Sequence, residues 1–103
     1  MTQPSPSALR DLIGNAPLRA SARAAMSIAD AVQRIPDYGS RFIGIASAFL
    51  ILCEESGISA ADLLTMTRNC MNDAEGKRPE FRAVARYVRH EIFDRNANAK
   101  HQE

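Results

Sequence analysis

The run Phe42–Cys53, FIGIASAFLILC, constrains the fold more than any other stretch, because Ser47 is its only polar residue. As a helix it spans about 18 Å, well short of the ~30 Å hydrocarbon core of a bilayer. Wound at 3.6 residues per turn it is apolar on every side, and such a helix is normally covered on every side. We therefore expect a buried helix of a soluble domain and no membrane association.

Turn and capping residues divide the rest of the chain. Residues 1–6 are expected to form a disordered tail, residues 7–94 a single helical domain, and residues 95–103 a polar tail. Glycine and proline breaks predict further helices at about 7–13, 18–35, 60–74 and 79–93. The fold class is therefore all-α: a compact bundle of four main helices, with a short fifth at the N-terminus, around a fully buried central helix.

The second helix carries an alanine-rich seam, whose residues recur at spacings of four and three: Leu18, Ala22, Ala25, Ala29 and Val32. Small residues allow close helix packing, and one interpretation seats this seam on Gly44 and Ala48 of the central helix. The other interpretation is a homodimer joined through the seam. The sequence leaves both open.

Composition narrows the function classes. Thirteen basic residues balance twelve acidic ones, which removes the simplest electrostatic case for general nucleic-acid or membrane binding. The two cysteines lie in apolar helical contexts, where we expect free thiols. No basic stretch followed by an apolar one marks a signal peptide at the N-terminus. We therefore expect a cytoplasmic protein.

A row of arginines makes the last helix the most informative one. Arg82, Arg86 and Arg89 fall within about 60° of one another on a helical wheel, and Arg78 joins them if the helix begins early. Like charges at i, i+4 cost roughly 0.2–0.5 kcal/mol per pair, so a group outside the helix should compensate them. One candidate is internal pairing with acidic residues 54–75, and the other is an acidic partner, with Phe93 and Tyr87 as aromatic anchors.

Other chemistries find less support. Residues 49–68 match half of a helix-turn-helix pattern, but the residues that would face a DNA groove cannot make bidentate base contacts. His90 and His101 have no Cys or carboxylate at catalytic or metal-ligand spacing, and no phosphate-binding glycine loop is present. We expect no enzymatic activity, no cofactor and no metal.

In general style the chain is similar to small helical accessory proteins of phages and prophages that bind a host or phage protein. The resulting expectation is a small non-enzymatic adaptor, inhibitor or regulator that binds an acidic protein through the arginine row. The alternative is a small DNA- or RNA-associated transcriptional regulator that uses the same basic face or the degenerate helix-turn-helix.

Overall fold

The computed structural model describes residues 3–94, and helices account for 78% of these residues. The expected helical class, including the short helix near the N-terminus, is confirmed. In chain order the described elements are α1 (Pro6–Gly14), α2 (Leu18–Gln33), α3 (Tyr38–Ser56), α4 (Ala60–Met71), β1 (Asn72–Asp73), β2 (Gly76–Lys77), α5 (Pro79–Tyr87) and the π-helical η1 (Val88–Asp94). Of the N-terminal tail expected at 1–6, residues 1–2 lie outside the described residues, whereas Ser5 caps α1 and Pro6 begins it. The C-terminal tail expected at 95–103 lies wholly outside the described residues.

Side-chain caps define where three of the helices begin. The side chains of Ser5, Asp37 and Ser59 each accept a hydrogen bond from a backbone N–H in the first turn of α1, α3 and α4. Such caps satisfy amide groups that have no partner within the helix. Gly57 ends α3 in the left-handed conformation, at φ 82°, which is a common way for a helix to stop.

A small hairpin replaces the expected end of the fourth helix. We expected that helix to continue to Ala74, but α4 stops at Met71, and β1 and β2 pair antiparallel through Asn72↔Lys77 and Asp73↔Gly76. The side-chain amide of Asn72 donates to the carbonyl of Arg68, which competes with continuation of the helix. Gly76 has a φ of 116°, a conformation that favours glycine in such a turn.

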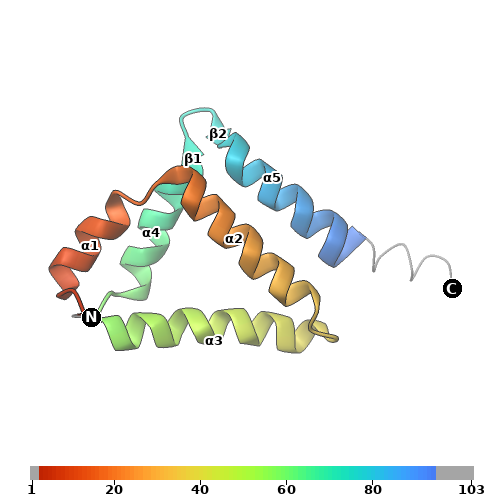
Figure 1. Ribbon diagram of the computed structural model, residues 1–103, viewed down its shortest axis with the longest axis horizontal. Coiled ribbons are helices and arrows are strands. Elements are labelled where there is room, and N and C mark those ends of the chain that lie inside the picture. The colour runs from red at the N-terminus through yellow and green to blue at the C-terminus, as the bar shows by residue number, and fades with distance from the viewer. Residues whose placement is uncertain (1–2, 95–103) are drawn as a thin grey trace, which may run out of the picture.

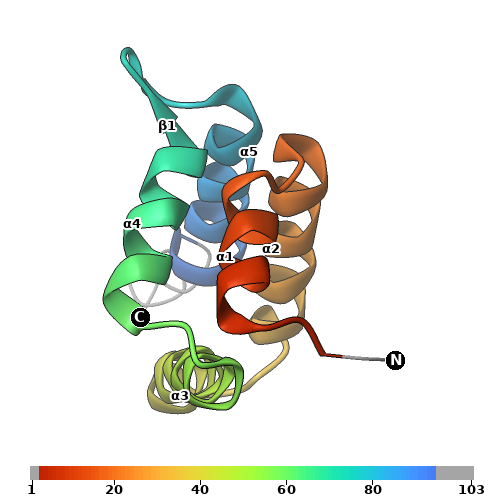
Figure 2. The same cartoon turned by 90° about the vertical axis from the view of Figure 1, so that its left-hand side faces the viewer.

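Helices α2 and α5 lie next to each other, and α3 lies across one end of the bundle (Figures 1 and 2). Figure 1 shows α2 and α5 side by side, with α3 along the lower edge and α1 and α4 on the left. Figure 2 shows α3 end-on beneath the other helices. The contacts between α2 and α5 form the largest packed interface between helices, while α3 contacts α2 and α4, to which short connections join it. The buried apolar side chains are Ala22, Ala29, Val32, Cys53, Ile58, Phe81 and Ile92.

The prediction of a fully buried central helix is wrong for the single chain. Six large apolar side chains of α3 are between 46% and 69% exposed: Phe42, Ile43, Ile45, Leu50, Ile51 and Leu52. The physical reason is that the other helices contact α3 from one side, so its far side has no cover from this chain. No single helix within residues 3–94 is long and apolar enough to cross a membrane; α3 and α4 meet that test only as a pair bent by 113°.

The predicted seat for the alanine-rich seam is also wrong. A Cβ atom built on Gly44 would have no neighbour within 4 Å, and Ala48 is exposed. The seam instead lies inside the chain, where α2 packs mainly on α5, with Ala22, Ala29 and Val32 buried. The bulky Phe81 of α5 is buried as well, so it supplies apolar volume beside a helix whose own seam is small.

Arg41 of α3 connects α3 to the end of α2 by side-chain hydrogen bonds. Its guanidinium donates hydrogen bonds to the carbonyls of Ile35 (2.6 Å) and Gln33 (3.0 Å), and it lies over the Tyr38 ring at 5.2 Å from the centroid. The carbonyls at the end of a helix lack partners within it, so a cation at this place satisfies them. Arg41 therefore holds α3 in its orientation across the bundle.

Candidate partner-binding surfaces

Three arginines of the predicted row, together with one lysine, gather around a shallow hollow. The hollow has a volume of about 320 Å³ and is lined by Lys77, Arg82, Ala85, Arg86 and Arg89. All four cations are exposed. Lys77 precedes α5 and reaches the hollow from β2, which is why a helical wheel of the last helix did not include it. We call this group of four residues the cationic hollow.

Arg78 does not belong to the cationic hollow. It is half-buried, and its Nε donates a hydrogen bond of 3.0 Å to the carbonyl of Cys70. It is also the N-cap residue of α5, and its backbone N–H donates to the carbonyl of Met71. Arg78 therefore fastens the hairpin and the start of α5 to the end of α4.

The cationic hollow has no internal counter-charge in the described part of the chain. The two ion pairs found within residues 3–94 join Arg10 to Asp62 at 2.6 Å and Arg34 to Asp30 at 3.0 Å. Asp62, one of the acidic residues expected to neutralise the row, is therefore paired with α1 instead. Arg82 donates one hydrogen bond to the carbonyl of Lys77, which positions its guanidinium without neutralising it.

The two aromatic residues expected as anchors have separate environments. The Tyr87 hydroxyl donates to Asp30 on α2 at 2.8 Å, and this bond to a carboxylate raises the pKa of Tyr87 above its ordinary value. Phe93 stacks on Tyr38 with 5.8 Å between ring centroids and meets Phe42 edge-on. It remains 41% exposed. Tyr87 thus ties α5 to α2, and Phe93 belongs to an aromatic cluster at the start of α3.

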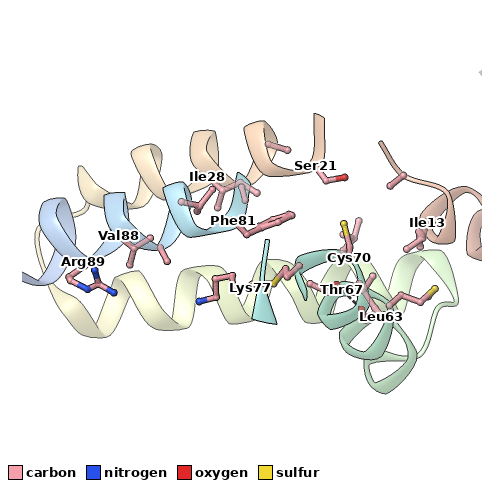
Figure 3. A pocket seen from close by; sticks show the side chains of 18 of the residues that line it. Ile13, Ser21, Ile28, Leu63, Thr67, Cys70, Lys77, Phe81, Val88 and Arg89 are labelled. Atoms are coloured by element: carbon pink, nitrogen blue, oxygen red, sulfur yellow. Dashed lines mark hydrogen bonds between the residues drawn. The ribbon is translucent and has the colours of Figure 1, made fainter. Parts of the chain in front are cut away.

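A large apolar groove lies between α2, α4 and α5. Its volume is about 930 Å³, and Figure 3 shows side chains from these helices, including Ile28, Cys70 and Phe81, that point into it. Lys77 and Arg89 of the cationic hollow also line this groove. A second groove of about 640 Å³ lies between α2 and α3, with Phe42, Ile45 and Phe49 on its α3 side. Protein interiors rarely contain voids of this size, and both grooves are open to solvent.

The opposite side of α3 forms a second uncovered surface. At 100° per residue, the face turned away from Phe42 and Phe49 holds Ile43, Gly44, Ser47, Ala48, Leu50 and Ile51. We call these six residues the outer face of α3. All six are exposed, and the three large ones are among the most exposed apolar side chains of the chain. Sequence reasoning found the apolar run but assigned its cover to the same chain.

The helix-turn-helix alternative meets its geometric requirement only in part. The bend of 113° between α3 and α4 falls within the 90–120° typical of the motif. The side chain of Ser59 is occupied as the N-cap of α4, and Asp62 is held by Arg10. Ala61 and Leu64 are exposed on α4 and offer no hydrogen-bonding group to a base edge.

The described residues show no metal-binding group, and comparison with known proteins suggests no function. Within residues 3–94, no three His, Cys, Asp or Glu side chains gather as a metal-binding group, and Cys53 and Cys70 are free thiols. Comparison of the chain with protein-family models, with curated proteins and with solved structures gives no match.

Proposed function

We propose that this chain is a small non-enzymatic protein that binds an acidic surface of another protein through the cationic hollow. The observation that carries the proposal is the convergence of four exposed cations on one depression, with no carboxylate paired to any of them within residues 3–94. Self-repulsion of such a group is unfavourable, and a partner carboxylate would relieve it. Arginine also binds carboxylates in a bidentate manner, which adds specificity.

The surroundings of the hollow favour a protein partner. Arg89 and Lys77 lie where the cationic hollow meets the apolar groove, so charge and apolar surface adjoin. Protein interfaces combine these two elements, with arginine enriched at their centres. A nucleic-acid partner would instead require a basic surface that follows a phosphate backbone, and the chain as a whole has a net charge of only +1.

Paired charge reversals test this proposal. The double variant Arg82→Glu, Arg86→Glu reverses two adjacent cations of the hollow, and Arg19→Glu, Arg23→Glu is the matched control, an exposed i, i+4 pair on α2. Proteins captured from the native host by the wild type should also be captured by the control variant and should be lost, by at least about 10-fold, from the hollow variant. Circular dichroism should show the same helicity in all three.

Three results would overturn the proposal. One is equal capture by the hollow variant, and another is unfolding of the hollow variant alone, which would make the arginines part of the internal structure. The third is DNA or RNA binding at low salt that falls steeply as salt rises and depends on Arg82 and Arg86, because that behaviour marks a phosphate partner.

A further inference from the structure

The outer face of α3 is a second surface that no other described helix of this chain covers (Figure 2). The three large apolar side chains of the outer face of α3, Ile43, Leu50 and Ile51, present on the order of 300 Å², at roughly 100 Å² each. Contiguous apolar patches of a few hundred Å² are about the largest that monomers expose, and they often mark an interaction site. A standard interface removes about 800 Å² from each partner, so the outer face would form the apolar centre of such an interface and the residues around it would form the rim.

We propose that a second copy of this chain covers α3, and that the two α3 helices pack antiparallel across a two-fold axis through their outer faces. This surface is distinct from the cationic hollow, and the inference goes beyond the proposed function. The lower side of α3 is free of other described elements in both views, so a second α3 has access to it (Figures 1 and 2). In a two-fold dimer the same patch must complement itself.

The outer face is self-complementary in the antiparallel orientation. If the helices cross at Ser47, Ile43 of one copy lies at the level of Ile51 of the other. Gly44 and Ala48 are small as well, and a Cβ on Gly44 would have open space around it, so these positions leave room for the facing helix. Small residues at a crossing also allow the helix axes to approach closely. The isoleucine pairs therefore flank a crossing made of small residues.

The charges at the ends of α3 select the same orientation. Glu54 and Glu55 are exposed in the last turn of α3, where the helix dipole disfavours negative charge, and neither forms an ion pair within residues 3–94. An antiparallel partner places them beside the N-terminal end of its own α3, where negative charge is favoured. Asp37 at that end caps α3 through the backbone N–H of Ser40, and the nearby Arg41 partly offsets its charge. A parallel pair would bring the four glutamates together.

Sedimentation equilibrium of three proteins tests the dimer. The wild type should have twice the 11.3 kDa chain mass. Ile51→Glu should weaken the dimer at least about 100-fold in Kd, because it buries a charge in the contact. Leu12→Glu is the matched control, since Leu12 on α1 is 62% exposed against 56% for Ile51, and it should remain dimeric. If Ile51→Glu fails to fold, Ile43→Ala provides the milder variant, with a Kd raised roughly 10-fold.

Disulfide cross-linking tests the orientation. In a background with Cys53 and Cys70 replaced by alanine, a mixture of Ile43→Cys and Ile51→Cys chains should cross-link between copies, and Ile51→Cys alone should not. A wild type that stays monomeric at about 100 μM overturns the dimer. Monomeric protein that instead binds phosphatidylcholine vesicles through α3 assigns the surface to lipid and overturns it too. Cross-linking of Ile51→Cys chains to one another overturns the antiparallel packing.

Discussion

Arg41 provides the strongest stability prediction, because it is a charged residue that is only 9% exposed. Arg41→Met keeps much of the apolar stem but removes both hydrogen bonds, to the carbonyl of Gln33 at the end of α2 and to that of Ile35 just after it. A hydrogen bond to a charged group contributes about 1.5–3 kcal/mol, and the two share one side chain, so we expect a total loss of about 3 kcal/mol. Arg41→Lys has an ammonium that should reach only one of the two carbonyls, so it should lose about half as much.

Urea unfolding followed by circular dichroism measures this loss. All variants should be compared at one protein concentration, since association would contribute to the apparent stability. Arg23→Ala, an exposed arginine on α2, is the control and should stay within about 0.5 kcal/mol of the wild type. If Arg41→Met loses no more than Arg23→Ala, then Arg41 does not fasten α2 to α3, and the account of how α3 is oriented is wrong.

Two further predictions concern single positions. Gly57→Ala should destabilise the protein by roughly 1–2 kcal/mol, because position 57 has a φ of 82°, whereas Gly14→Ala should be neutral in the same denaturation assay. The hydrogen bond from Tyr87 to Asp30 raises the pKa of Tyr87 above its ordinary 10.0, so the folded state holds this proton more tightly than the unfolded state. Stability should therefore fall as the pH rises above about 10, and Tyr87→Phe should remove that part of the alkaline slope; an unchanged slope would contradict the assignment.

Local signals in the sequence located most helix ends. Ser59 begins α4 as an N-cap, Pro79 opens α5, and Gly57 closes α3, as their conformational preferences predict. The hairpin after Met71 was missed because two-residue strands carry no periodicity. Capping residues and helix breakers were therefore readable from the local sequence, whereas the two-residue strands were too short to be recognised.

The cover of α3 could not be predicted in the same way. An all-round apolar helix such as Phe42–Cys53 indicates that something must surround it, but periodicity does not say whether that cover belongs to the same chain. In this chain α2 uses its small-residue seam against α5, which leaves Gly44 and Ala48 without a neighbour. The seam of α2 could pack on either of two apolar helices, α3 or α5, and the sequence alone does not decide between them because that choice depends on tertiary packing.

The sequence predicted that three arginines share one face of the last helix, but it did not give the full set of residues that line the hollow. The 100° spacing of the α-helix predicted at 79–93 places Arg82, Arg86 and Arg89 together, and the structure brings them to one hollow, with Arg82 and Arg86 on α5 and Arg89 on η1. Lys77 reaches that hollow from outside the helix, and Arg78 leaves it because the carbonyl of Cys70 accepts its side chain. Helical periodicity places residues of one element only, so contributions from the hairpin were not visible.

One distance tests the central claim, that α3 is covered by a second copy. A spin label at Glu55, at the C-terminal end of α3, in the background lacking native cysteines, reports the separation between the two copies by pulsed electron resonance. Antiparallel helices that cross at Ser47 place the two labelled positions about 24 Å apart along the helix axis, at 1.5 Å per residue. A distance distribution centred near 25–30 Å is the expected result, with allowance for the helix spacing. A parallel pair would give about 10 Å, and a signal with no intermolecular distance would show that a second copy does not cover α3.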